Sequence, residues 1–255
     1  MSDVEPGGVI DATGLAPGPR TRIFEASRVV RLGDADRSGR LRLDALARHL
    51  QDVATDDSLD SGMVDAPIVW VVRRAAIRIG RWPRYLERLG YTTFCSGTGP
   101  RWAERRTSAR GSAGGSLEAA VLWAGLDPAS GRLTPLPDLF YKVWGDGDGR
   151  QVSARLAHPA PPAGAEARPW ATRASDLDVM GHVNNAAHWE AVEDELARRL
   201  PGRIPVAAEC EYRLPLDLDD RVGVVTSVEG GSLRLWLLSD AGVHASAVVT
   251  TEPGD

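Results

Sequence analysis

Cysteine is scarce in this chain, which has only two in 255 residues. Cys95 and Cys210 lie in separate strand-like segments, far apart in the sequence. A disulfide framework and a metal site made of several thiolates both require more cysteines at closer spacing. The sequence therefore argues against both, and we expect each thiol to be a reduced residue of the hydrophobic core.

Long apolar runs and an excess of positive charge are missing as well. The longest apolar runs, such as residues 68–72, are far too short to span a bilayer, so we expect no membrane partner. A net charge of -5 argues against a nucleic-acid partner, because a phosphate backbone requires a basic surface. Residues 1–20 lack the basic start and the apolar core of a signal peptide, which predicts a flexible tail on a cytoplasmic protein.

Lysine is almost absent, and arginine takes its place. Lys142 is the only lysine, and arginines are concentrated between Arg73 and Arg110. One interpretation is a solvated face of a sheet, where these side chains simply meet water. The other is a local patch that binds an acidic carrier or a phosphate-bearing substrate.

What the sequence does contain is an internal repeat. When residues 30–53 are aligned with residues 172–195, a shift of 142 positions, five pairs of identical or similar residues coincide. They include an Asp-x-Asp pair and the glycine that follows it, which indicates a duplication. The pairs are Arg31 with Arg173, Asp34 with Asp176, Asp36 with Asp178, Gly39 with Gly181, and Gln51 with Glu193.

Each copy continues into an amphipathic helix and then into several strand-like runs broken by glycine and proline. Apolar residues recur every three or four positions in both helices, which predicts one buried stripe per helix. The stripes comprise Leu43, Leu46, Leu50 and Val53 in the first copy, and Trp189, Val192, Leu196 and Leu200 in the second. A helix with one apolar stripe needs a broad sheet to cover it, so we expect two α+β units, each an antiparallel sheet wrapped around a central helix.

The boundaries of these units follow from composition. Residues 145–168 are rich in glycine, proline and alanine without a sustained period, which predicts a linker. We therefore expect a tail over residues 1–20, an N-terminal unit over 21–144 and a C-terminal unit over 169–255.

Four segments carry a resemblance to a known family: "SDLDVMGHVNN" at residues 175–185, "VEDEL" at 192–196, "CEYRLP" at 210–215 and "LQDVATDDS" at 50–58. The chain resembles the acyl-acyl-carrier-protein thioesterases, which are built from two fused hotdog domains. The resemblance implies a cytoplasmic hydrolase of fatty acid biosynthesis that cleaves acyl thioesters of acyl carrier protein or coenzyme A. It also implies that the catalytic machinery lies in the C-terminal repeat, and that the acyl pocket leans on the N-terminal one.

The resemblance assigns the second aspartate of the motif to Asp178 and the motif histidine to His182. Two positions depart from the plant-type pattern. Met180 replaces a polar asparagine, and Pro215 occupies the place of a catalytic acid. These departures keep a non-catalytic acyl-thioester-binding or sensing protein open as the alternative, with a hotdog dehydratase as a weaker one.

Thioester hydrolysis requires a polarised carbonyl and an activated water. We expect the free amides at the start of the second helix, residues 184–187, to form an oxyanion hole. Asp178, just ahead of this helix, can orient or deprotonate water, or attack the carbonyl itself. The alternative is an aspartate that only caps a turn.

His182 can accept or relay a proton near neutral pH, or serve only as a hydrogen-bonding spacer. Asn184 and Asn185 are good N-cap residues that can also bind the water or the carbonyl. Glu193 follows Trp189 by four positions on the face of the apolar stripe, so we expect a second base or water-orienting group there, with a surface glutamate as the alternative.

The first copy has different residues at these positions, with Arg40 in place of His182 and Gln51 in place of Glu193, which predicts one active site per chain. We expect no cofactor and no metal, because His182 and His188 lack a third ligand nearby. A fused pair of hotdogs supplies internally the pairing that single hotdogs obtain by dimerising, so a monomer and a homodimer are both open.

Overall fold

The computed structural model describes residues 15–18 and 21–254. Apart from residues 15–18, the tail predicted over residues 1–20 lies outside the described residues. No helix in the described part of the chain is long and apolar enough to cross a membrane.

The first half of the chain runs through a strand, a long helix and four further strands, as the repeat predicts. Its elements are β1 (Ile23–Val29), the 3-10 turn η1 (Leu32–Asp34), α1 (Leu43–Asp60), η2 (Met63–Asp65), β2 (Val69–Arg81), β3 (Arg88–Gly99), β4 (Trp102–Gly111), β5 (Ser116–Leu126) and α2 (Asp138–Trp144). The sequence pattern did not predict α2, because seven residues between proline- and glycine-rich segments are too few to show a helical period.

The second half repeats the same succession. Its elements are β6 (Arg168–Trp170), η3 (Ala174–Asp176), α3 (His188–Arg199), β7 (Arg203–Tyr212), β8 (Val222–Glu229), β9 (Ser232–Ser239) and β10 (Gly242–Pro253). Between α2 and β6 the chain has almost no regular structure, apart from an isolated bridge between Gln151 and Thr98.

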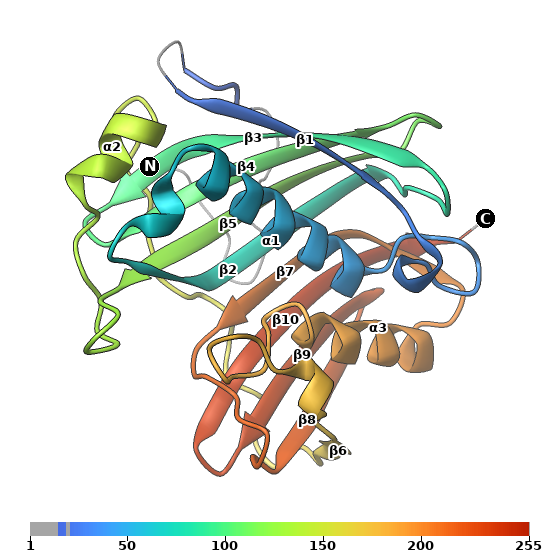
Figure 1. Ribbon diagram of the computed structural model, residues 1–255. Helices are drawn as coiled ribbons and strands as arrows, with labels where there is room; N and C mark the ends of the chain where they lie inside the picture. The colour runs from blue at the N-terminus through green and yellow to red at the C-terminus, as the bar shows by residue number, and fades with distance from the viewer. Residues whose placement is uncertain (1–14, 19–20, 255) are drawn as a thin grey trace.

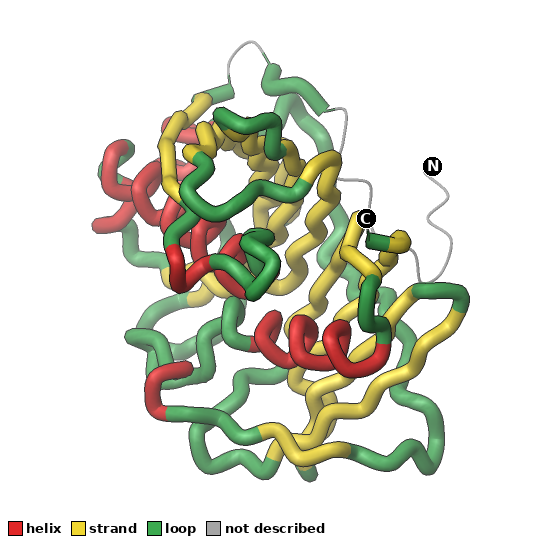
Figure 2. The backbone as a smooth tube through the Cα atoms, turned by 90° about the vertical axis from the view of Figure 1, so that its right-hand side faces the viewer, coloured by secondary structure: helices red, strands yellow, loops and turns green. Residues whose placement is uncertain are grey.

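The strands form one ten-stranded sheet in the order β1-β3-β4-β5-β2-β7-β10-β9-β8-β6. Matching strands of the two repeats therefore stand at matching distances from the centre, where β2 pairs antiparallel with β7. Figure 1 shows α1 lying along the N-terminal half of this sheet and α3 along the C-terminal half, and Figure 2 shows the same arrangement from the side. The predicted α+β fold of two fused hotdog domains is confirmed.

The predicted stripes are the faces that the two helices bury. In α1 the four stripe residues are at most 6% exposed, and in α3 the first three are at most 5% exposed, while Leu200 is half buried at the C-cap. Complete burial of one leucine side chain contributes about 1.5–3 kcal/mol, so these stripes fix both helices on the sheet. The two cysteines are free and buried, as predicted.

Candidate active site

Both repeats fold the Asp-x-Asp segment into the same hydrogen-bonded turn. In the second copy the Asp178 N–H donates to the His182 carbonyl over 2.9 Å, and the Gly181 N–H donates to the Asp178 carbonyl over 3.0 Å. The first copy makes the same contacts 142 residues earlier. Gly39 and Gly181 have φ angles of 82° and 81°, a left-handed conformation that favours glycine. The alignment of the repeats therefore holds at the level of single hydrogen bonds.

Asp178 is half buried and keeps one carboxylate oxygen free. Its Oδ1 accepts the Met180 N–H over 2.9 Å, while no group in the described chain donates to its Oδ2. In the first copy both oxygens of Asp36 are taken, because Oδ1 accepts from Ser38 and Oδ2 accepts from Arg40 Nε over 2.9 Å. Only the second copy thus offers a carboxylate oxygen to an external molecule.

His182 is exposed and pairs with an acid that the sequence pattern did not single out. Its Nδ1 lies 2.5 Å from Asp217 Oδ1. Asp217 stands two positions after Pro215, the residue at the expected place of a catalytic acid, and its own N–H donates to Asp220 over 2.9 Å. The acidic run at residues 217–220 was the available signal, but spacing alone could not select one of its aspartates.

Asn184 organises the approach to α3. Its side-chain Oδ1 accepts the Ala186 N–H over 2.9 Å, and its carbonyl accepts the Ala187 N–H over 2.9 Å. Its own N–H donates to the Asp176 carbonyl over 2.8 Å. Three of the four amides in residues 184–187 are therefore occupied, and α3 itself begins only at His188. The expectation that all four amides line an oxyanion hole is wrong, because three of them already donate to Asp176 or Asn184. No acceptor for the Asn185 N–H lies among the described residues.

Asn185 is held through its oxygens by two residues from other elements. Gln51 on α1 donates through Nε2 to the Asn185 side-chain oxygen over 2.5 Å, and to that of Asn184 over 3.2 Å. The Tyr212 hydroxyl, at the end of β7, donates to the Asn185 carbonyl over 3.0 Å. These contacts come from segments far apart in the sequence, so the motif alone did not identify Gln51 or Tyr212.

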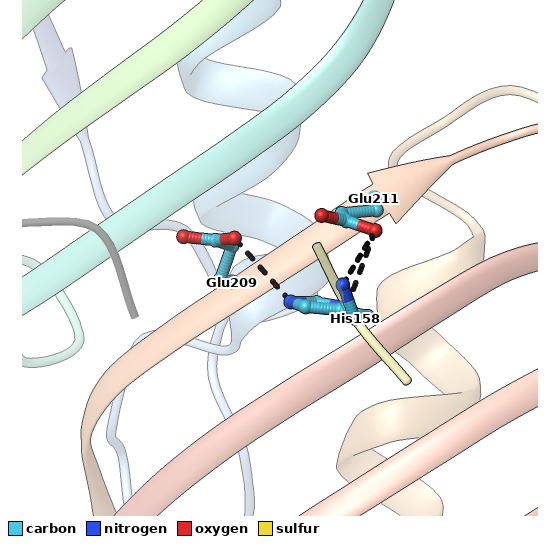
Figure 3. Close-up of side chains that lie close together, drawn as sticks. All are labelled: His158, Glu209 and Glu211. Atoms are coloured by element: carbon cyan, nitrogen blue, oxygen red, sulfur yellow. Dashed lines mark hydrogen bonds and ion pairs between the residues drawn. The ribbon is translucent and has the colours of Figure 1, made fainter. Parts of the chain in front are cut away.

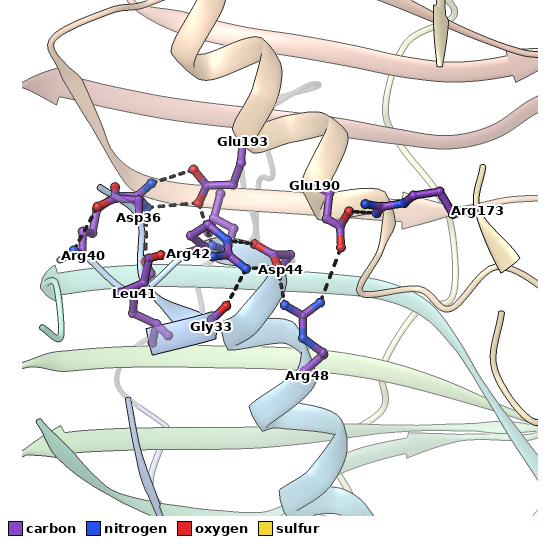
Figure 4. A network of polar contacts seen from close by, with 12 residues as sticks. Gly33, Asp36, Arg40, Leu41, Arg42, Asp44, Arg48, Arg173, Glu190 and Glu193 are labelled. Carbon is purple, nitrogen blue, oxygen red and sulfur yellow. Dashed lines mark hydrogen bonds and ion pairs between the residues drawn. The ribbon is translucent and has the colours of Figure 1, made fainter. Parts of the chain in front are cut away.

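Glu193 lies on the side of α3 that faces α1, and it is not part of the Asp178 turn. Arg40 donates to its two oxygens over 3.1 and 2.6 Å (Figure 4). The Leu43 N–H at the start of α1 donates to Oε1 over 2.6 Å. Burial acts to lower the pKa of Arg40, but the carboxylates of Glu193 and Asp36 together outweigh it, so the pKa is raised. The contacts give Glu193 a structural position between the repeats, and the catalytic role expected from the sequence stays a prediction.

His188 is buried where α3 begins and packs edge-on against Tyr212, with the ring centroids 5.4 Å apart. Burial lowers its pKa to about 4. The imidazole is therefore neutral at physiological pH, where its Nδ1 contacts the Asn184 carbonyl over 3.2 Å. It supports the cap of α3 rather than carrying charge.

A cavity of about 400 Å³ opens beside α1 in the N-terminal repeat. Its walls are mostly apolar and aromatic, and they come from α1, the segment after it, β2–β5 and α2. The aromatic lining residues are Trp70, Trp123, Phe140 and Trp144. Val179, the neighbour of Asp178, is the lining residue that the C-terminal repeat contributes. The Asp178 turn of one repeat therefore stands beside an apolar cavity in the other.

A second, much smaller cavity lies between the helices where the two repeats meet. Gln51, Asn185 and Tyr212 line it together with apolar side chains. Trp123 lines both cavities, so the two adjoin at this side chain. Asn185 thus lines a small cavity that adjoins the apolar one.

A separate cluster of three ionisable side chains lies on the other face of β7, beneath the linker. His158, Glu209 and Glu211 bring three possible metal-ligand atoms within 4.8 Å of one another (Figure 3). However, Glu211 already accepts the N–H groups of Ala157 and His158, and Arg213 donates to it over 2.7 Å. These contacts fasten the linker to the sheet, and none of the three residues belongs to the Asp178 turn.

Two fused helix-in-sheet domains, with an apolar cavity beside the Asp178 turn, form a double-hotdog protein. Residues 21–144 match the acyl-ACP thioesterase N-terminal domain, and residues 161–251 match the acyl-ACP thioesterase C-terminal domain. The chain belongs to the acyl-ACP thioesterase family, and it is a thioester hydrolase.

The fold is shared with solved structures of low sequence identity. A protein described as an oleoyl thioesterase from Lactobacillus plantarum superposes with a TM-score of 0.78 at 22% identity, covering 94% of this chain and all of that one. The 12:0-ACP thioesterase from Umbellularia californica gives 0.75 at 19% identity, covering 91% and 97%. An uncharacterized protein of Mycobacterium tuberculosis, Rv2001, is 24% identical over 85% of this chain and 87% of its own length.

Proposed function

We propose that the enzyme releases free fatty acid from fatty acyl thioesters at a site built around Asp178, His182, Asn184 and Asn185, with the acyl chain in the 400 Å³ cavity of the N-terminal repeat. The observation that carries the proposal is the position of Val179, which follows Asp178 and lines that cavity. A volume of this size lies within the range of about 300–1,000 Å³ that small-molecule sites occupy.

In the proposed reaction, the oxygen of a water molecule adds to the thioester carbonyl carbon. The free oxygen of Asp178 accepts a proton from that water, and the donors of Asn185 bind the carbonyl oxygen as it becomes negative. When the intermediate collapses, the carbon–sulfur bond breaks and the sulfur leaves as a thiolate. The proton taken by Asp178 passes to the sulfur with His182 as the relay, so the products are a free acid and a thiol.

Acyl carrier protein is the donor we favour, and coenzyme A is the second candidate. Part of the arginine cluster between Arg73 and Arg110 is used within the fold, since Arg105 pairs with Asp57 and Arg110 pairs with Glu118. Arg84 and Arg88 are exposed, and neither guanidinium group pairs with a carboxylate of the described residues. They support a carrier-docking patch.

A cytoplasmic location and a state of monomer or homodimer complete the proposal.

The test is thiol release from a panel of acyl thioesters on acyl carrier protein and on coenzyme A. Activity on the carrier-bound series supports the proposal. A non-catalytic binder, the alternative that Met180 and Pro215 favour, would shift the melting temperature with acyl ligand and release no thiol. The contact between His182 and Asp217 favours the enzyme, because it supplies a carboxylate that the proline cannot.

The cavity assignment has its own test in Ala103, a small lining residue that is 6% exposed. Ala103→Leu fills part of the cavity, so we expect the relative kcat/KM for long acyl chains to fall against that for short chains. A change of two or three methylenes in the preferred chain corresponds to about 2 kcal/mol at roughly 0.8 kcal/mol per methylene. Equal losses for all chain lengths would place the acyl chain elsewhere.

A further inference from the structure

The N-terminal helix contributes a side chain to the catalytic turn of the C-terminal repeat. Gln51, half buried on α1, donates through one nitrogen to the side-chain oxygens of both Asn184 and Asn185. Gln51 and Asn185 line the same small cavity, which adjoins the larger one at Trp123. Gln51, which lies outside the segment 175–185, therefore contacts Asn185, the residue whose donors can serve as an oxyanion hole.

The effect on Asn185 is specific, because both of its oxygens are held. Gln51 holds the side-chain oxygen, and the Tyr212 hydroxyl holds the carbonyl oxygen over 3.0 Å. Burial raises the pKa of Tyr212 well above its ordinary value, so this hydroxyl stays protonated and donates. No described residue accepts a hydrogen bond from the Asn185 N–H or from its Nδ2. Asn185 is thus fixed by its acceptors and presents two donors, the combination that suits an oxygen gaining negative charge.

At the corresponding place in the first repeat, the opposite helix α3 carries an acid, Glu193, and the hydrogen bonding differs. Glu193 occupies the position of Gln51 on the other helix, and it accepts the N–H of Leu43, which stands at the position of Asn185. A carboxylate can only accept hydrogen bonds, whereas a primary amide can donate them. Glu193 therefore occupies the N–H of Leu43, whereas Gln51 leaves the N–H of Asn185 available.

We infer that Gln51 is a positioning residue of the thioesterase site, which orients Asn184 and Asn185 so that the two donors of Asn185 face the thioester carbonyl. The inference rests on the proposed function. It makes the active site a joint product of both repeats, since the N-terminal repeat supplies the orienting amide as well as the acyl cavity.

The primary test is Gln51→Glu, assayed with an acyl thioester of a small thiol. The new carboxylate would take the donors of Asn185 as Glu193 takes the Leu43 N–H. We expect kcat to fall about 100-fold, the loss typical of one oxyanion donor, with KM little changed. Gln151→Glu, the same substitution at an exposed position, is the matched control. An unchanged kcat in Gln51→Glu would overturn the inference.

The pH dependence separates positioning from damage to the fold. A protonated carboxyl group can donate a hydrogen bond as the glutamine does, so the ratio of variant to parent kcat should rise as the pH is lowered. A fold defect predicts no such rise. A ratio that stays constant with pH overturns the inference.

A double-mutant cycle covers the case in which the glutamate variant folds poorly. If Gln51 acts through Asn185, Gln51→Ala should slow an Asn185→Ala enzyme no further, whereas independent roles give additive losses and overturn the inference. A parent chain that releases no thiol from any acyl thioester overturns the proposed function and this inference together. An active parent with an unaffected Gln51→Glu variant overturns the inference alone.

Discussion

Gln51 and Glu193 hold matching positions on the two central helices, and each contacts the turn that precedes the other helix. Gln51 donates to the two asparagines ahead of α3, and Glu193 accepts from Arg40 and Leu43 ahead of α1. The exchange fastens the repeats to each other at two related places. The two places also differ, because Glu193 forms an ion pair with Arg40 at the first, whereas at the second Gln51 leaves the donors of Asn185 available.

The Glu193 contact should be measurable as stability. Its partner Arg40 has a side chain that is 10% exposed, so Glu193→Gln leaves a largely buried guanidinium with one carboxylate fewer. We expect the free energy of unfolding to fall by about 1–3 kcal/mol, the usual loss for a buried hydrogen-bonded charge. Urea unfolding followed by circular dichroism measures the change.

Glu190→Gln is the control for this effect. Glu190 pairs with Arg48 and Arg173, but its side chain is 32% exposed, so its loss should cost less than about 1 kcal/mol. Activity is measured on the same proteins. A fall in kcat for Glu193→Gln at an unchanged free energy of unfolding would instead support the catalytic role that the sequence suggests.

Asp178→Asn should remove most turnover while the fold stays intact. The asparagine keeps an oxygen for the Met180 N–H, so the turn is retained, but it cannot take a proton from water. We expect kcat to fall by at least about 100-fold, the smaller end of what a positioned base contributes, with the melting temperature within a few degrees of the parent.

Asp36→Asn is the matched change in the first repeat. It removes a charge from the pair with Arg40 Nε, which is 2.9 Å long, so it should lower the melting temperature more than Asp178→Asn does. Its kcat should follow the parent. Full activity in Asp178→Asn would show that this aspartate only shapes the turn.

The repeat, the two helices and the Asp-x-Asp turns could be predicted because each depends on residues close together in the sequence. The stripe from Leu43 to Val53 and the glycine of each turn are local signals of this kind, and the structure agrees with them. The start of α3 shows the limit even of local reasoning. Asn184 looked like an N-cap directly before the helix, but its oxygen caps Ala186 inside an extra turn, and the helix begins at His188.

The contacts that complete the site could not be predicted in the same way. Gln51 and Asn185 are brought together only because β2 pairs with β7 and sets the two helices side by side. Periodicity predicted Glu193 on the face of the apolar stripe, and its side chain is 14% exposed, but periodicity cannot tell that it contacts Arg40 and not the sheet. A side chain that points inward can meet a substrate or a guanidinium, and the register of the central strands decides between them.

His188 predicts a loss of stability in acid. Burial lowers its pKa in the folded protein from 6.5 to about 4, so between these values the unfolded chain binds a proton that the folded chain does not. Stability should therefore fall as the pH drops from 6.5 toward 4, by up to about 3 kcal/mol at 1.36 kcal/mol per pKa unit.

His188→Phe, which keeps an aromatic ring beside Tyr212, removes this proton-binding group. Its unfolding free energy should decline less steeply over the same pH range than that of the parent, whatever its absolute stability. Burial also lowers the pKa of His49, and that residue contributes equally to both proteins, so the difference between the slopes isolates His188. Parallel slopes would contradict the prediction.

Asp217 should matter to catalysis through His182. The carboxylate 2.5 Å from Nδ1 fixes the imidazole ring and leaves its other nitrogen to relay the proton. Asp217→Asn should reduce kcat by roughly tenfold or more, a part of the 100-fold or so that a positioned acid–base group contributes. Because both side chains are about half exposed, at 47% and 59%, the melting temperature should hardly change.

Two controls isolate the pair of Asp217 and His182: a substitution in the same loop, and a double-mutant cycle of the two residues. Asp219→Asn removes an exposed carboxylate two residues away and should leave kcat at the parental value. If Asp217 acts only by orienting His182, then Asp217→Asn should add nothing to the loss in His182→Ala, because the group it positions is gone. Additive losses would mean that Asp217 meets the substrate or the water directly. An unaltered kcat in Asp217→Asn would show that Asp217 does not replace the acid missing at Pro215, and that the site works through Asp178 without this pair.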